Sequence, residues 1–157
     1  MRRKDREIVD VGAIDAILRE ADACRLALIG GGVPYAVTLN YGFERSADGA
    51  LVLYFHCARE GRKLDAIRSD PRAAFIVDTA HELVRGEKGC DWGMRYRSVA
   101  GNGVVSFVSD DAEKRRGLDL LMEHYSGSRG FEYDDRVFAV TEVLRLDVEA
   151  CSGKEKA

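Results

Sequence analysis

Hydrophobic and polar residues alternate along much of the chain, and a period of two is typical of half-buried β-strands. Residues 24–29 and 34–41 follow this pattern and are separated by three glycines, so we expect two strands joined by a glycine turn. The second strand would divide its side chains between two faces, with Tyr35, Val37, Leu39 and Tyr41 on one and Ala36, Thr38 and Asn40 on the other.

More strands are expected further along the chain. The segments that predict them are 51–56, 73–78, 81–85, 96–108 and 137–150. Glycines interrupt the 96–108 segment, which indicates a bend there. In the last segment the alternating apolar positions are Phe138, Val140, Leu144, Leu146 and Val148.

Three segments carry helix signals instead. The first has apolar residues at helical spacing, namely Ile14, Ile17, Leu18 and Ala21, with Asp10 as its candidate N-cap. The second is ended by Pro71, which cannot continue a helix. The third opens on Asp110 and Glu113, which match a capping box, and its apolar face carries Leu118, Leu121, Met122 and Tyr125. About six strands with short turns and three helices predict an α+β protein built on an antiparallel barrel.

Composition narrows the class of protein. The 157 residues are 46% hydrophobic and 32% charged, which predicts one folded domain over residues 1–157. The net charge of −3 gives no general attraction to nucleic acid or to an anionic membrane. The basic start, Arg2-Arg3-Lys4, leads into acidic residues, unlike a signal peptide, and no apolar run approaches the roughly 18 residues of a membrane span. Four scattered cysteines indicate free thiols, so we expect a cytoplasmic protein.

Several familiar kinds of site are not predicted. The three glycines at 30–32 precede a strand rather than a helix, so they indicate a hairpin turn and not a dinucleotide loop. Gly101-Asn102-Gly103 lacks the third glycine of such a loop and fits a bulge better. The three histidines do not pair with cysteines at zinc-ligand spacings, so no metal site is expected.

The segment after residue 55 carries the clearest candidate chemistry. His56 and Cys57 end an apolar run, and three cations, Arg59, Arg62 and Lys63, follow where a helix begins. A helix N-terminus is already partly positive, so cations there are misplaced unless an anion compensates them. One interpretation is therefore an anion site, most naturally for a phosphate. The other is a solvated charged face, and these residues alone leave both open.

Three stretches together resemble a known family. They are "PYAVTLNYGFE", "LYFHCAREGRKLDAIRSDPRAAFIVD" and "YRSVAGNGVVSFV", the last of them before a helix that contains "EK". They are similar to the nitroimidazole-resistance (Nim) group of the pyridoxamine 5′-phosphate oxidase-like flavoproteins, and the resemblance runs from about Arg3 to the terminal "SGKE". It implies a split β-barrel that forms a homodimer, with FMN in a groove between the two subunits.

The resemblance also implies roles for individual residues. Arg62 and Lys63 match the basic residues that bind the phosphate, and Arg59 is either a third or faces solvent. His56 matches a histidine near the flavin, with a catalytic or a structural role, while Cys57 would simply pack.

The same resemblance assigns the flavin ring. Thr38, Leu39 and Asn40 match the strand that passes along the isoalloxazine, although Asn40 fits a strand-end turn equally well. Trp92 would cover the ring or the substrate, or serve as a partly buried aromatic residue.

The implied function is an FMN-dependent oxidoreductase that reduces small electrophiles, such as the nitro group of 5-nitroimidazoles, by two-electron transfer. The sequence has no recognisable nicotinamide-binding motif, so the electron donor is left open, with NADH or NADPH as the candidates. Oxidation of pyridoxamine phosphate is not expected, because the chain ends "CSGKEKA" and lacks the arginine-rich segment of the oxidases proper. Members tied to haem or deazaflavin leave two alternatives: a flavin- or haem-binding protein with little turnover, or a barrel whose groove serves only protein interaction.

Overall fold

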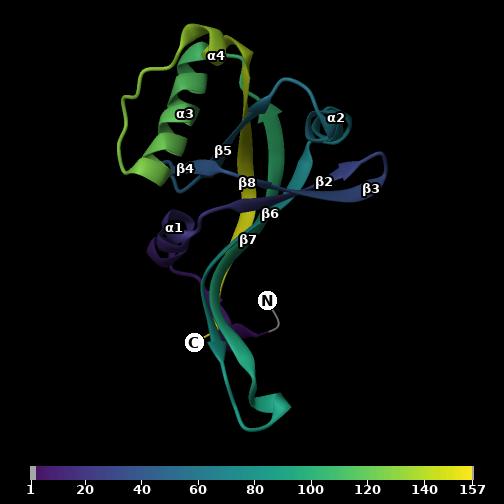
Figure 1. The fold of residues 1–157 in the computed structure, drawn as a ribbon, viewed down its shortest axis with the longest axis vertical. Helices are drawn as coiled ribbons and strands as arrows, with labels where there is room; N and C mark the ends of the chain where they lie inside the picture. The colour runs from purple at the N-terminus through teal and green to yellow at the C-terminus, as the bar shows by residue number, and fades with distance from the viewer. Residues whose placement is uncertain (1–2, 157) are drawn as a thin grey trace.

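The computed structural model describes residues 3–156, so that Arg2 of the basic start lies outside the described residues. Its strands are β1 Glu7–Ile8, β2 Cys24–Gly30, β3 Val33–Leu39, β4 Tyr41–Arg45, β5 Leu51–Ala58, β6 Arg72–Val84, β7 Gly93–Phe107 and β8 Thr141–Lys156. Its helices are α1 Val11–Glu20, α2 Arg62–Ser69, α3 Asp111–Ser126 and α4 Asp135–Val140, with 3-10 turns at Lys4–Arg6 and Gly89–Asp91. These elements confirm the predicted α+β class (Figure 1).

The strands form one antiparallel sheet in the order β3-β2-β6-β7-β8-β5-β4, with β1 added to β8. The two edge strands, β3 and β4, are separated in the chain by Asn40 alone. The sheet therefore curls until its two edges meet at this residue, as a split barrel does. The prediction of one strand over 34–41 is wrong, because Leu39 pairs with Cys24 of β2 whereas Tyr41 pairs with Phe55 of β5.

Strand β5 is buried on both faces. Leu51, Leu53 and Phe55 point into the barrel, where α1 and α2 complete the core. Val52 and Tyr54 point the other way, into a second core formed with α3 and α4. This two-sided burial explains why residues 51–55 read as a continuous apolar run rather than an alternating one.

The predicted strand over 137–150 is wrong in its first part, because α4 occupies residues 135–140. The Asp134 carboxylate caps this helix by accepting hydrogen bonds from the amides of Arg136 and Val137, at 2.9 and 3.1 Å. Phe138 packs into the second core, whereas Val140, which the strand pattern grouped with it, is exposed. The cap thus overrides an alternation that four residues can show by chance.

The two segments predicted as separate strands at 73–78 and 81–85 form one strand, β6. Its register shifts between Thr79 and Glu82, and Ala80 adopts a φ of 56° at this bulge. The predicted bend of the next strand is confirmed, since β7 shifts register against β8 between Asn102 and Gly103. The lower parts of β6 and β7 form a long hairpin that extends away from the barrel (Figure 1).

The three predicted helices are confirmed as α1, α2 and α3. Asp10 caps α1 by accepting a hydrogen bond from the Ala13 amide at 2.7 Å. Asp110 caps α3 in the same way, through the Glu113 amide at 2.8 Å. The Glu113 carboxylate, however, accepts a hydrogen bond from Arg145 of β8 at 2.8 Å instead of closing the capping box. Of the helices within residues 3–156, none has the length and apolar character needed to cross a membrane.

Candidate functional site

The end of β5 carries His56 to the surface of the barrel. Because Phe55 points into the core, the next side chain points outward, and His56 is exposed there. Partial burial lowers the pKa of the imidazole, and the positive charge of Lys63 lowers it further. His56 is therefore a neutral imidazole at neutral pH, able to donate one hydrogen bond and accept another.

Two of the predicted cations, Arg62 and Lys63, open α2, and Arg59 lies just before it. Lys63 is close enough to influence the pKa values of both His56 and Cys57, although burial keeps the pKa of Cys57 raised. The guanidinium of Arg62 stacks over the ring of Tyr35, 4.4 Å from its centroid. Arg59 is exposed.

These three cations differ from their neighbours in having no ion pair with any residue in the described part of the chain. Arg68, one turn further along α2, pairs with Asp65 at 3.1 Å, and Arg72 pairs with Asp70 at 2.6 Å. No side chain caps the first turn of α2, whose N-cap is Gly61 at a φ of 134°. Uncompensated positive charge and uncapped amides thus coincide at one place, which suits an anion.

A hollow of about 540 Å³ opens next to His56 between the end of β5, α3 and α4. Its lining residues are Asn40, His56, Leu118, Leu121, Met122, Tyr125, Glu132, Tyr133, Asp134, Val137, Phe138 and Thr141. We call it the apolar hollow. Sequence reasoning found the apolar face of α3 but missed what it lines, because α4 was predicted as a strand. The signal that would have found α4 is Asp134 directly before its first turn.

Two glycines set the position of α3, and hence of the apolar hollow. A Cβ atom at Gly42 of β4 would lie 2.4 Å from the carbonyl carbon of Leu120. One at Gly117 would lie 2.9 Å from the ring of Tyr54. The helix therefore approaches the sheet as closely as backbones without side chains allow.

The other predicted residues are divided between two regions. Thr38 is exposed on the outer face of β3, Leu39 is buried, and Asn40 lines the apolar hollow together with His56. Trp92 is 49% exposed and belongs to the segment that joins β6 to β7. That segment lies at the bottom of Figure 1, at the opposite end of the molecule from α2. Within one subunit the structure does not bring Trp92 together with His56 and Lys63.

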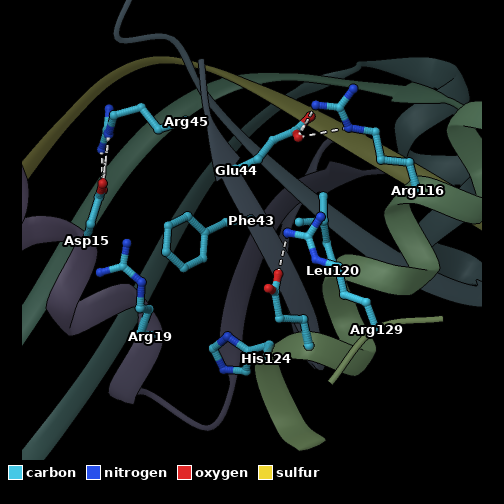
Figure 2. A pocket seen from close by; sticks show the side chains of 10 residues that line it. Asp15, Arg19, Phe43, Glu44, Arg45, Arg116, Leu120, His124 and Arg129 are labelled. Atoms are coloured by element: carbon cyan, nitrogen blue, oxygen red, sulfur yellow. Dashed lines mark hydrogen bonds and ion pairs between the residues drawn. The ribbon is translucent and has the colours of Figure 1, made fainter. Parts of the chain in front are cut away.

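A larger cavity of about 690 Å³ lies between α1, β4 and α3 (Figure 2), and none of the predicted site residues lines it. Most of its charges are satisfied internally. Arg45 pairs with Asp15 at 2.7 Å, and Figure 2 shows the further pairs Arg116–Glu44 and Arg129–Glu123. This cavity is a network of ion pairs rather than a candidate active site. Among residues 3–156 no three His, Cys, Asp or Glu side chains gather as a metal site would require.

Comparison with known proteins gives a consistent relationship. A family model described as pyridoxamine 5′-phosphate oxidase matches residues 10–155. A structure described as a candidate 5-nitroimidazole antibiotic resistance protein from Bacteroides thetaiotaomicron is 31% identical, with a TM-score of 0.81 over 95% of this chain and 86% of that one. No curated protein matches the sequence.

Two more distant structures share the fold. One is a flavocytochrome from Azotobacter vinelandii, 21% identical, with a TM-score of 0.78 over 100% of this chain and 72% of that one. The other is an FAD- and haem-binding protein from Mycobacterium smegmatis, 24% identical, with a TM-score of 0.80 over 96% and 73%. The family match and the 31% identical relative together establish that the chain belongs to the pyridoxamine 5′-phosphate oxidase-like family.

Proposed function

We propose that the protein is an FMN-dependent reductase of small electrophiles, with nitroaromatics such as 5-nitroimidazoles as substrates. One observation carries the proposal: three cations without ion pairs among the described residues gather around the start of α2, and one of them, Lys63, lies near a neutral histidine that lines an apolar hollow. Membership of the family supports a flavin, and the 31% identical relative, described as a candidate 5-nitroimidazole antibiotic resistance protein, supports the substrate class.

The start of α2 fits the phosphate of FMN. Lys63 and Arg59 would hold it through charged hydrogen bonds, and the uncapped amides of the first helical turn would add neutral ones. Arg62 would contribute from its place over Tyr35, since stacking on a ring leaves the N–H groups of a guanidinium free. The misplaced charges of this helix would then be compensated by the ligand.

The flavin ring would lie along the segment that joins the two sheet edges. Thr38, Leu39 and Asn40 would offer backbone groups and short polar side chains to its edge, and His56 a neutral hydrogen-bonding group. Bound FMN would supply the redox chemistry, by accepting two electrons from NADH or NADPH and passing a hydride to the substrate. The residues of the chain would bind and orient the cofactor and the substrate, and would exclude water from them.

We also propose that two copies share this site as a homodimer. Ala36, Ala27 and Ala74 lie directly opposite one another across β3, β2 and β6, and all three are exposed. Ile76 adds a larger apolar side chain, 41% exposed, to the same face. Arg25, which pairs with Asp78, lies opposite Ile76 on this face. The outer face of an antiparallel sheet in water is usually polar throughout, so the apolar group beside this ion pair favours a second copy. Thr38 belongs to this face, which would bring the ring-binding segment to the interface.

Trp92 fits the shared site only as a residue of the second copy. It lies at the end of the β6–β7 hairpin, and the exposed side chains of Leu83 and Met94 lie opposite each other on that hairpin. An extended hairpin that carries these exposed apolar side chains is suited to reach across a dimer. We therefore propose that each subunit places its Trp92 near the flavin of the other.

The test is to incubate the flavin-loaded protein anaerobically with NADH or NADPH and a 5-nitroimidazole. With an excess of the nicotinamide, we expect the flavin absorbance to bleach and the nitro compound to be converted to its amine, which takes six electrons and therefore three equivalents of NADH or NADPH. Bleaching with every nitro compound left intact would contradict the substrate assignment. Flavin or haem binding without any bleaching would favour a binding protein with little turnover.

A further inference from the structure

We infer that the apolar hollow is the substrate pocket of this reductase and that it selects uncharged molecules against anions. The inference rests on the proposed function, because it uses the position of the flavin beside His56 and Asn40. It adds the substrate class and the residues that determine it.

The lining of the apolar hollow determines the chemistry that it accepts. Most of its wall is made of aliphatic and aromatic side chains from α3 and α4, namely Leu118, Leu121, Met122, Tyr125, Val137 and Phe138. Its uncharged polar groups include Asn40 and, on the neighbouring strands β5 and β8, His56 and Thr141. A flat apolar molecule could therefore bury its ring against the helices while its polar group faces the histidine.

The charges at the apolar hollow have one sign. Among the described residues that line it, Glu132 and Asp134 are acidic, and none is Lys or Arg. Asp134 is occupied as the cap of α4, whereas Glu132 is exposed. An anion that entered would lose water without gaining a cation, beside two carboxylates. The positive charges at the start of α2 would thus bind the cofactor, whereas the lining of the apolar hollow, where the substrate would bind, is apolar and acidic.

The wall formed by α4 is fixed in place from α3. Lys114, which is only 8% exposed, donates a hydrogen bond of 2.6 Å to the carbonyl of Phe138. Tyr133 donates one of 2.9 Å to Asp119, and burial is the main cause that raises the pKa of this phenol to about 12. These contacts hold the outer wall at both ends, so the apolar hollow is a preformed pocket.

The helix offers a matched pair of variants. Val137 and Val140 lie on α4 and are 61% and 60% exposed, but only Val137 lines the apolar hollow. The probe is 6-propionyl-2-(dimethylamino)naphthalene, an uncharged dye whose emission shifts to the blue in apolar surroundings. It is titrated into the purified protein without reductant, and its competitors are nitrobenzene and 4-nitrobenzoate, which differ only by a carboxylate.

We expect Val137→Trp to weaken dye binding by roughly tenfold and Val140→Trp to leave it within about twofold, because only the first variant fills the hollow. Nitrobenzene should displace the dye at a concentration roughly tenfold lower than 4-nitrobenzoate does. Glu132→Lys should narrow that difference between the two competitors roughly fivefold, while Glu155→Lys, the same change at an exposed position near the far end of β8, should not.

Equal effects of the two tryptophan variants would show that the dye binds elsewhere and would overturn the inference. So would equal displacement by the two competitors. The binding experiment is independent of turnover. If dye binding and displacement follow the expected pattern but no nitro compound is reduced, the result supports the pocket and contradicts the proposed reaction.

Discussion

His124 is held between two tyrosines on the inner side of α3. Its ring lies 4.7 Å from that of Tyr41 and 4.6 Å from that of Tyr125, and its Nε2 lies 3.0 Å from the carbonyl oxygen of Ala21. Burial lowers the pKa of this imidazole despite the opposing influence of the Ala21 carbonyl and of Asp22. The folded protein therefore favours the neutral form of His124.

This burial predicts a loss of stability in weak acid. Because the pKa is lower in the folded state than the value of 6.5 in the unfolded chain, the unfolded state takes up more protons as the pH falls below about 6.5. We expect the free energy of unfolding in urea to decrease between pH 7.5 and pH 5.5. In His124→Gln, which keeps a neutral donor for Ala21, the decrease should be smaller, although His56 still contributes in the same direction. A decrease of the same size in the variant would contradict this account.

At the scale of single residues, the sequence predicted which kinds of side chain gather near the candidate site. It did not predict where each side chain points. The order of His56, Arg59, Arg62 and Lys63 made an anion site one of two interpretations, and it stays a prediction. That Arg62 stacks on Tyr35 depends on where β3 lies against α2, which no local pattern contains. The position of Trp92 likewise depends on the length of the β6–β7 hairpin, whose first strand the sequence divided into separate strands at 73–78 and 81–85.

At the scale of elements, α4 depends on one buried cation. The ammonium of Lys114 lies 4.3 Å from the ring centroid of Phe138 and donates to its carbonyl near the C-terminus of the helix. A charged hydrogen bond of this kind contributes about 1.5–3 kcal/mol, and a cation is favoured at a helix C-terminus. A six-residue helix is too short to be stable without such contacts.

Lys114→Met keeps most of the apolar stem but removes the donor. We expect amide hydrogen exchange in residues 135–140 to become at least tenfold faster, while exchange in the strands of the barrel changes little. Lys88→Met, on the exposed segment between β6 and β7, is the control. It should change hydrogen exchange neither in residues 135–140 nor in the strands of the barrel. Unchanged protection of α4 in Lys114→Met would mean that its apolar contacts suffice.

The contact between Lys114 and α4 also illustrates why some helices were predictable from the sequence and α4 was not. α1 and α3 have both a cap and an apolar face within their own sequence, and both were predicted. Residues 137–140 alternate as a strand would, and the groups that decide against it are Asp134 and a lysine more than twenty residues away. The break at Asn40 is equally non-local, because it arises where the two edges of the sheet meet.

At the scale of the whole molecule, the apolar face of β3, β2 and β6 predicts a homodimer. Light scattering at micromolar concentration should give twice the mass of the 17.4 kDa chain. Ala27→Lys should dissociate it, because an ammonium placed between Ala36 and Ala74 would be buried without a partner. Val9→Glu, at a position 80% exposed away from this face, should remain dimeric. A monomeric wild-type protein that still binds FMN tightly would refute the shared site.

If the cations at the start of α2 hold the phosphate of a flavin, then the affinity for FMN depends on them. Lys63 and Arg68 lie on the same helix, but Arg68 is already occupied by Asp65 and the ring of Phe107. In a titration followed by flavin fluorescence, Lys63→Glu should weaken binding by at least about tenfold to a hundredfold, because a charged hydrogen bond is lost and repulsion is added. Arg68→Glu should change FMN affinity by less than about threefold, although it weakens the helix. Equal losses in the two variants would contradict the account and leave the cations as a solvated face.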